Sequence, residues 1–362
     1  MKITALHARL IRIPRSDTLK TSYGNEDTAP TILVVLETDA GITGVGQASV
    51  DMPFYGETAE GMLANIRTHL APAVIGQDPH NITLIQQKMR KALPHHLFSH
   101  AGVDMALFDL KGKALAVPLY DLLGGKVRPG LTLMGFVHLD EPRKMADEAR
   151  KSLDEHGYSV LKMKIGLDPQ EDLARYRAVA DAVNGRAVIQ ADGNTGYTID
   201  QALPTLKHMQ DIGSLGTVEQ PVARMHDMAI LADRLHAPIM ADEAIYPPED
   251  AIEVIRTGAA SLALMKISKH GGIDNVHKIG MLFEAAGLSL SIAIYYDLIG
   301  VAAAHLAAAL PAVKWPSPAT SLQDTIVKNP LTPDGLSLAA PDAPGLGVEL
   351  DWDKVERYTV KA

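Results

Sequence analysis

The chain has 362 residues, a formal net charge of −9 at pH 7 and no cysteine. This length is sufficient for one large domain and a smaller one, and the lack of cysteine excludes disulfides and thiol catalysis. The negative charge, with no run of lysine and arginine residues, argues against a nucleic-acid partner.

The first third of the chain predicts a domain of mixed strands and helices. Two strand-like segments, 3–13 and 31–46, flank a turn-rich stretch, and the second segment contains the hairpin-like turn 38–41. Helical patterns follow at 57–74, 79–93 and 99–115. We therefore expect an α+β domain over residues 1–127.

From Leu131 onward, apolar runs alternate with helical patterns. The runs lie at 131–138, 160–165, 187–192, 215–219, 238–242, 261–267, 288–294 and 313–321. The helices between them fit 141–156, 170–184, 198–212, 224–236, 248–257, 272–287 and 297–310. Eight runs and seven helices predict an α/β fold, a parallel (β/α)8-type (TIM-like) barrel over residues 128–325.

The last part of the chain departs from this alternation. Residues 322–340 are rich in proline, aspartate and glycine and show no clear eighth helix. We expect the tail, residues 326–362, to return to the first domain.

Neither membrane insertion nor secretion is indicated. The N-terminus alternates like a strand and has no apolar segment of the signal-peptide type. The longest apolar stretch, 301–310, is too short to span a membrane and is interpreted as a buried helix. We therefore expect a cytoplasmic, soluble protein with no membrane partner.

Five charged residues end successive apolar runs, with steps of 23 to 28 residues: Lys164, Asp192, Glu219, Asp242 and Lys266. One strand-plus-helix unit of a barrel needs about 25 residues, and barrel enzymes keep their chemistry at the C-terminal ends of the strands. If the run at 131–138 is the first strand, the two lysines end the second and sixth strands, which face each other across the ring. The three acids then fill the arc between the lysines.

The three acids predict a metal site. Asp192, Glu219 and Asp242 would repel one another and raise their own pKa values without a cation between them. Ligation by oxygen alone suits a hard divalent ion, with Mg²⁺ as the first choice. The alternative interpretation is that the acids are solvated strand-end residues or helix N-caps.

The lysines predict acid–base chemistry. Lys162 and Lys164 stand two residues apart on one apolar strand, so both side chains point into the barrel. Their mutual repulsion and a nearby divalent cation would lower the pKa of Lys164 toward the working pH, as a general base requires. Lys266 lies in an equally apolar run, and a surface or ion-pairing role is the alternative for these lysines.

A metal ion with a lysine on either side has a definite chemical use. Removal of a proton next to a carboxylate creates a dianionic enolate, and a metal ion together with cationic side chains stabilises that charge. The predicted reaction class is proton abstraction α to a carboxylate, or the reverse addition of a proton to the enolate.

At these positions the chain resembles the enolase superfamily, in its muconate-lactonizing subgroup. The matching motifs are Lys162-Met-Lys164, Gln190-Ala-Asp192-Gly-Asn194, Val218-Glu219-Gln-Pro221, Met240-Ala-Asp242-Glu243 and Lys266-Ile-Ser-Lys-His-Gly-Gly272. These motifs run through most of the predicted barrel. The N-terminal part resembles the capping domain of the family, so the resemblance spans nearly the whole chain.

The resemblance implies roles for the motif residues. The three acids would bind Mg²⁺, for which Mn²⁺ often substitutes, and Lys164 and Lys266 would be the acid–base catalysts. Lys162 would tune Lys164 or contact the substrate carboxylate, and Asn194 and Glu243 would support the metal site. Substrate choice would come from capping-domain loops at 21–27 and 51–57, with candidate contacts Tyr23, Phe54 and Tyr55, for which loop packing is the alternative.

Departures from the family patterns bear on the activity. The run 288–294 has no histidine, which argues against mandelate racemase chemistry and sugar-acid dehydration, and it lacks a clear match to the glutamate of muconate enzymes. Residues 321–324 do not reproduce the Asp-x-Asp pair with which dipeptide epimerases hold a free amino group. Asp324, Lys269 and His270 stay open as substrate contacts.

We therefore expect a Mg²⁺-dependent isomerase that moves a proton α to the carboxylate of a small molecule through an enolate. A muconate-cycloisomerase-like reaction is the first expectation. The alternatives are a racemase or epimerase of an amino-acid derivative (an N-acyl amino acid, a proline betaine or a dipeptide) and a β-elimination dehydratase. A non-catalytic scaffold would lack a ligand or a base, and none is missing. We also expect a homo-oligomer.

Overall fold

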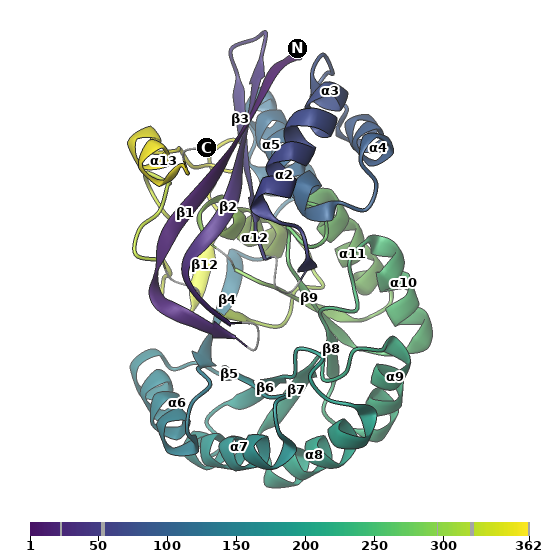
Figure 1. Cartoon of the computed structure of the whole chain (residues 1–362), viewed down its shortest axis with the longest axis vertical. Helices are drawn as coiled ribbons and strands as arrows, with labels where there is room; N and C mark the ends of the chain where they lie inside the picture. The colour runs from purple at the N-terminus through teal and green to yellow at the C-terminus, as the bar shows by residue number, and fades with distance from the viewer. Residues whose placement is uncertain (22–23, 52–54, 295, 319–321, 361–362) are drawn as a thin grey trace.

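The computed structural model describes residues 1–21, 24–51, 55–294, 296–318 and 322–360. A small sheet with helices forms one end of the molecule, and a ring of parallel strands surrounded by helices forms the other (Figure 1). Within the described ranges, no helix has the length and apolarity that a membrane crossing requires.

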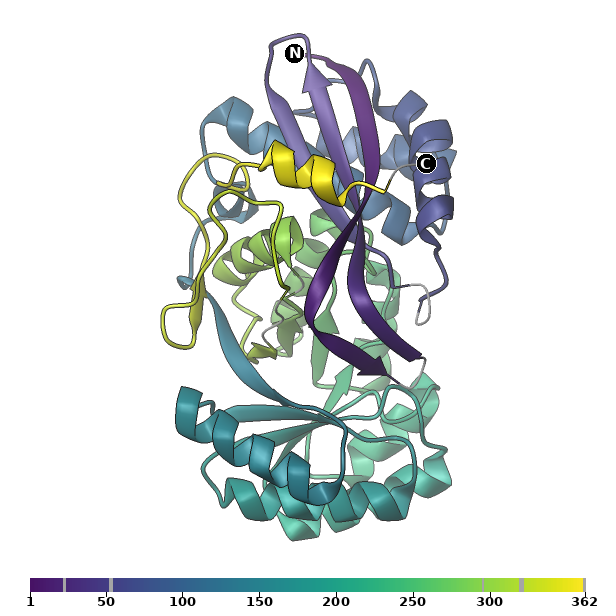
Figure 2. The same cartoon turned by 60° about the vertical axis from the view of Figure 1, so that its left-hand side comes forward.

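The N-terminal sheet is an antiparallel meander of β1 (Ile3–Thr21), β2 (Gly24–Thr38) and β3 (Thr43–Ser49). The segment predicted at 31–46 divides at the turn that the sequence indicates, where Gly41 has a φ of +74°. β1 continues past the predicted end at residue 13, and β2 begins before the predicted start at residue 31. Together they form a ribbon that reaches from the small sheet to the barrel (Figure 2).

The longest helix of this domain, α5 (Leu97–Leu115), packs on β3 and β2. The approach is close because Gly46 lies in β3: a Cβ at this position would lie 2.1 Å from the carbonyl oxygen of Gly102. Further helical segments within the described residues of this domain are α2 (Ala59–Asn65), the π-helical η1 (Ile66–Leu70), α3 (Ala71–Val74), α4 (Ile82–Ala92) and the 3₁₀-helical η2 (Leu119–Leu123).

The predicted barrel strands correspond to a continuous parallel sheet, in the spatial order β10-β9-β8-β7-β6-β5-β4-β11. Its strands are β4 (Gly130–Val137), β5 (Val160–Lys164), β6 (Val188–Asp192), β7 (Leu215–Glu219), β8 (Ile239–Ala241), β9 (Leu262–Met265), β10 (Ser289–Ile292) and β11 (Ser317–Pro318). The helices between them are α6 (Pro142–His156), α7 (Pro169–Val183), α8 (Ile199–Ile212), α9 (Met225–Arg234), α10 (Pro248–Thr257), α11 (Ile273–Ala285) and α12 (Asp297–Ala309).

The eighth run closes the ring. Val313 forms a parallel bridge to Leu290 beside β10, and β11 pairs in parallel with β4. The predicted strand at 313–321 is thus short, and its residues 319–321 lie outside the described ranges. Inside the ring, the apolar side chains form a cluster of their own: Met240, Leu262, Leu264, Ala293 and, partly buried, Trp315.

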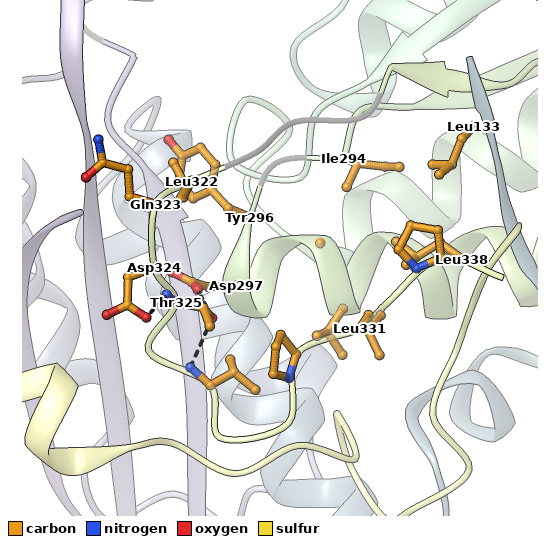
Figure 3. Close-up of a pocket in the computed structure, with 15 residues that line it drawn as sticks. Leu133, Ile294, Tyr296, Asp297, Leu322, Gln323, Asp324, Thr325, Leu331 and Leu338 are labelled. Carbon is orange, nitrogen blue, oxygen red and sulfur yellow. Dashed lines mark hydrogen bonds between the residues drawn. The ribbon is translucent and has the colours of Figure 1, made fainter. Parts of the chain in front are cut away.

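No helix occupies residues 322–340, all of which the structure describes. Proline at 330 and 333 disfavours a helix there, and β12 (Ser337–Ala339) instead pairs antiparallel with β4. A cavity of about 410 Å³ lies between this segment, α12 and the barrel wall (Figure 3). Its apolar lining includes Leu133, Ile294 and Leu331, and Asp324 lies at its polar side.

The chain then runs back to the N-terminal sheet. The last helix, α13 (Trp352–Tyr358), packs on β1. The backbone N–H of Val360 donates to the carbonyl oxygen of Leu10 at 2.9 Å, and Arg9 forms an ion pair with Glu356 at 2.9 Å.

One buried carboxylate joins α5 to the barrel. Asp104 Oδ2 accepts a hydrogen bond from the backbone N–H of Ile273 at 2.5 Å, at the first residue of α11. Gly272 packs directly against this carboxylate, where it has a φ of +122°. The helix N-terminus that follows the sixth barrel strand is therefore held by the capping domain.

Replacement of Gly272 by alanine tests this junction. A Cβ at this position would lie 2.2 Å from Asp104 Oδ2, so alanine has to displace the carboxylate that binds α11. We expect the free energy of unfolding to fall by about 3 kcal/mol, from backbone strain and overpacking together, as measured by urea denaturation.

Gly258→Ala is the matched control, because Gly258 also has a positive φ (+63°) but no neighbouring atom within 4 Å of a new Cβ. We expect a loss of about 1 kcal/mol there, from strain alone. Equal losses in the two variants would contradict the role assigned to the Asp104 contact.

Candidate active site

The five charged residues of the repeating pattern come together at one end of the barrel. Lys164, Asp192 and Glu219 are the last residues of β5, β6 and β7, whereas Asp242 and Lys266 directly follow β8 and β9. The register pairs Lys164 with Asp192 and Asp192 with Glu219, so their side chains start at one level. The strand order places three strands between β5 and β9 on either side of the closed ring, so the two lysines stand on opposite strands.

Asp192 and Glu219 share a buried lysine. Both carboxylates are fully buried, and Lys162 Nζ lies 2.9 Å from Asp192 Oδ2 and 2.6 Å from Glu219 Oε2. Lys164 Nζ reaches the same oxygen of Asp192 at 2.6 Å. Two lysines on one face of β5 therefore meet two carboxylates on the neighbouring strands.

Asp242 is held by two other lysines. Lys266 forms an ion pair with its Oδ2, and the fully buried Lys269 donates to its Oδ1 at 2.7 Å and to its backbone carbonyl oxygen at 2.5 Å. Lys266 Nζ also donates to the hydroxyl oxygen of Tyr55 at 2.6 Å. The capping-domain loop thus reaches the second lysine directly.

Burial and charge act on these groups in opposite directions. Burial disfavours the charged forms of Asp192 and Asp242, but the adjacent lysines outweigh it and hold the pKa of each carboxyl below its ordinary range. For Glu219, burial and repulsion from Asp192 raise the pKa to about 7. Burial also opposes the charge of Lys162, yet the two carboxylates hold its pKa above the usual value. Glu219 is therefore the acid whose charge is least compensated.

The acids suit a hard divalent cation by their chemistry. In the described ranges no three Asp, Glu or His side chains converge closely enough to hold an ion, and lysine ammonium groups lie against the acids. Glu219 Oε1, however, is buried and accepts a hydrogen bond from no described residue. Three buried carboxylates on consecutive strands, one of them with an oxygen that lacks a donor, fit Mg²⁺ or Mn²⁺.

Asn194 and Glu243 lie beside this cluster. Asn194 Oδ1 accepts a hydrogen bond from Lys164 Nζ, and its Nδ2 donates to Glu243 Oε1 at 2.9 Å. The backbone N–H of Asn194 donates to Asp192 Oδ1 at 3.1 Å, with the residue in the left-handed region at φ +38°. Asn194 therefore connects the first acid, the first lysine and Glu243.

The other predicted residues fall in different places. Tyr55 is brought to Lys266, whereas Tyr23 and Phe54 lie outside the described residues. Asp324 is not brought to the lysines: its carboxylate accepts hydrogen bonds from Lys354 at 2.6 Å and Tyr358 at 2.8 Å, beside the cavity of Figure 3.

Some contacts of the cluster were not predicted from the sequence. Lys269, which we considered as a substrate contact, is buried behind Asp242 instead of facing outward. Gln190 donates a hydrogen bond to Glu219, a contact that is absent from the predicted site. Its position two residues before Asp192, on the same face of a strand, is the signal that indicates such a contact.

A closed parallel barrel with charged residues at its C-terminal strand ends defines a barrel enzyme. Two family models match this chain: "Enolase C-terminal domain-like" at residues 144–354, and "Mandelate racemase / muconate lactonizing enzyme, N-terminal domain" at residues 6–124. The chain therefore belongs to the mandelate racemase/muconate lactonizing enzyme group of the enolase superfamily.

Similar proteins include isomerases of several kinds. The chain is 31% identical to N-succinyl-L-Arg/Lys racemase from Bacillus cereus, over 99% of this chain and 98% of the relative. It is 33% identical to a hydrophobic dipeptide epimerase from Enterococcus faecalis (85% and 88%) and 32% identical to muconate cycloisomerase 1 from Pseudomonas putida (90% and 90%).

Solved structures agree with this assignment. The crystal structure of the Bacillus cereus racemase superposes with a TM-score of 0.94 at 29% identity, covering 100% of this chain and 99% of that chain. The Enterococcus faecalis epimerase, crystallised with Mg and the dipeptide L-Leu-L-Tyr, gives a TM-score of 0.89 at 30% identity, covering 96% and 99%. The chain is thus an enzyme of the isomerase type, in a superfamily whose members use Mg²⁺.

Removal of the shared lysine tests the charge balance of the site. Lys162→Met leaves two buried carboxylates without the cation between them, so we expect the free energy of unfolding of the metal-free protein to fall by about 3 kcal/mol. Urea denaturation without Mg²⁺ measures this loss.

Lys144→Met is the control, because Lys144 pairs with Asp140 on the surface, where both side chains are exposed. We expect a change within about 0.5 kcal/mol for this pair. A similarly small change for Lys162→Met would show that the buried acids do not depend on this cation.

Proposed function

We propose that the enzyme racemises or epimerises a small carboxylate at its α-carbon, with an N-acyl amino acid as the substrate class. One observation carries this proposal: Lys164 and Lys266 stand on opposite strands of the ring, with the acid cluster between them. A carboxylate held over the acids meets one amine on each face of its α-carbon. One lysine removes the proton, and the other returns a proton to the opposite face.

Lys164 and Lys266 are both accessible to a substrate. Their side chains keep 29% and 15% of their surface exposed, whereas Lys162 and Lys269 are buried beneath the same acids. The buried pair therefore compensates charge, and the exposed pair is left for proton transfer.

Asp192, Glu219 and Asp242 would hold the divalent cation. When bound, the cation stabilises the negative charge that develops on the substrate carboxylate as the α-proton leaves. Asn194 keeps Lys164 and Asp192 in position, and Tyr55 keeps Lys266 in position, so each amine faces the α-carbon from its own side.

An acylated amine fits the site better than a free one. A free ammonium group requires an available carboxylate, and the candidate acid Asp324 is bound to Lys354 and Tyr358. The Bacillus cereus relative, which is named for N-succinyl amino acids, aligns over nearly the whole chain. Both observations support a neutral amide at the α-substituent.

Muconate-type cycloisomerisation, the first expectation from the sequence, is the second candidate. It needs one lysine to protonate the enolate, and it is supported by the similarity to muconate cycloisomerase 1. The proton transfer of this reaction involves only one of the two lysines. Racemisation uses both.

Exchange of α-protons in D₂O, followed by NMR on the two enantiomers of N-succinyl and N-acetyl amino acids, tests the proposal. We expect Lys164→Ala to slow the α-proton exchange of one enantiomer by a factor of about 10³, and Lys266→Ala to slow that of the opposite enantiomer by a similar factor. In each variant, most of the exchange rate of the other enantiomer should remain. If neither variant affects exchange, or if both affect the same enantiomer, the two-lysine mechanism is wrong.

Tyr55→Phe examines the capping-domain contact with Lys266. Phenylalanine keeps the ring contacts with Phe98 and Tyr246, at centroid distances of 5.4 and 5.9 Å, but removes the hydroxyl acceptor. We expect the exchange rate of the enantiomer whose α-proton points toward Lys266 to fall about 10-fold, because a hydrogen bond to the charged lysine is lost. The other enantiomer serves as the internal control, and an equal fall for both would point to a general packing effect.

A further inference from the structure

Below the acids, a polar chain continues into the barrel. Gln190 is fully buried on β6 and faces the interior on the same side as Asp192. Its Nε2 donates to Glu219 Oε2 at 2.5 Å, and its Oε1 accepts a hydrogen bond from the indole Nε1 of Trp315 at 2.5 Å. Trp315 packs on the apolar cluster inside the ring, close to the start of the eighth strand.

We propose that Gln190 and Trp315 are positioning residues that aim Glu219 at the divalent cation. The inference rests on the proposed role of Glu219 as a metal ligand. Neither residue would touch the substrate or the ion; both would act through the orientation of the glutamate.

The chemistry of the indole fixes the direction of the chain. A tryptophan N–H can only donate, so the glutamine must turn its carbonyl oxygen toward Trp315 and its NH₂ group toward Glu219. The acceptor oxygen of Glu219 favours the same orientation of the amide. Trp315 and Glu219 therefore hold the amide in one orientation, with its NH₂ group toward the acid.

The hydrogen bond from Gln190 helps to determine which oxygen of Glu219 is available to a cation. Lys162 and Gln190 both donate to Oε2 of Glu219, at 2.6 and 2.5 Å. Oε1 is left buried with no donor among the described residues. Because Oε2 is held by these two hydrogen bonds, Oε1 is the oxygen available to the cation. Rotation of the carboxylate would break both hydrogen bonds.

Trp315 also provides a direct readout. The chain has two tryptophans, and the other, Trp352, is 50% exposed at the start of α13. In Trp352→Phe, the remaining emission comes from Trp315, one residue away from Glu219 along the hydrogen-bonded chain. We expect this emission to change when Mg²⁺ is added. The dissociation constant obtained from the emission should equal the one that calorimetry gives.

The decisive variant is Gln190→Met in the Trp352→Phe background, because methionine has similar length and donates no hydrogen bond. We expect the Mg²⁺ dissociation constant to rise about 10-fold, as is typical when a residue that orients a metal ligand is lost, and the Trp315 response to shift to the same weaker constant. Trp315→Phe keeps an aromatic ring in the cluster but lacks the N–H, and calorimetry should give a rise of about 5-fold.

Gln201→Met is the matched control, because Gln201 forms the capping box of α8 with Thr198 and does not contact the acids. It should reduce stability and leave the Mg²⁺ dissociation constant unchanged. Wild-type Mg²⁺ affinity in Gln190→Met and Trp315→Phe would overturn the positioning role while leaving the proposed function intact. No Mg²⁺ binding to the wild-type enzyme would overturn both.

Discussion

The compensation of buried negative charge is the constraint on which the site depends. Asp192, Glu219 and Asp242 are completely buried at the ends of apolar strands, and buried carboxylates are costly unless cations and hydrogen bonds surround them. The chain provides four lysines for this purpose, two from β5 and two from the segment after β9. Two are buried beneath the acids, and two reach the open side. The proposed proton transfer is assigned to the two lysines on the open side, and charge compensation to the two buried ones.

The barrel makes this cluster possible because parallel strands end at one level. A register that pairs Lys164 with Asp192 and Asp192 with Glu219 brings residues nearly 30 positions apart into contact. The capping domain contributes two contacts to this end of the barrel. It contributes the Tyr55 hydroxyl to Lys266, and Asp104 holds the helix that follows the sixth strand. The two domains therefore complete the site together.

Much of this architecture could be predicted from the sequence, because the repeat length of a barrel and the apolar character of its strands leave a regular signal. The ends of β5, β6 and β7 fall on the expected residues. Contacts that depend on tertiary packing leave no such signal. Lys266 meets Tyr55 across 211 positions, and Trp315 meets Gln190 across 125. Asp324 lies after the eighth strand in the sequence, and Lys354 from the C-terminal helix α13 donates a hydrogen bond to it.

The central claim is that two lysines act on opposite faces of one α-carbon. It is tested most directly by wild-type turnover of a single N-acyl amino acid enantiomer in D₂O, with the isotope content of the product measured from the first turnovers by NMR or mass spectrometry. If two lysines act, the product enantiomer carries deuterium from the outset, because its α-hydrogen comes from the second lysine, whose ammonium group has exchanged with the solvent. A product that retains the protium of the substrate would show that one base serves both faces, and the two-lysine mechanism would be wrong.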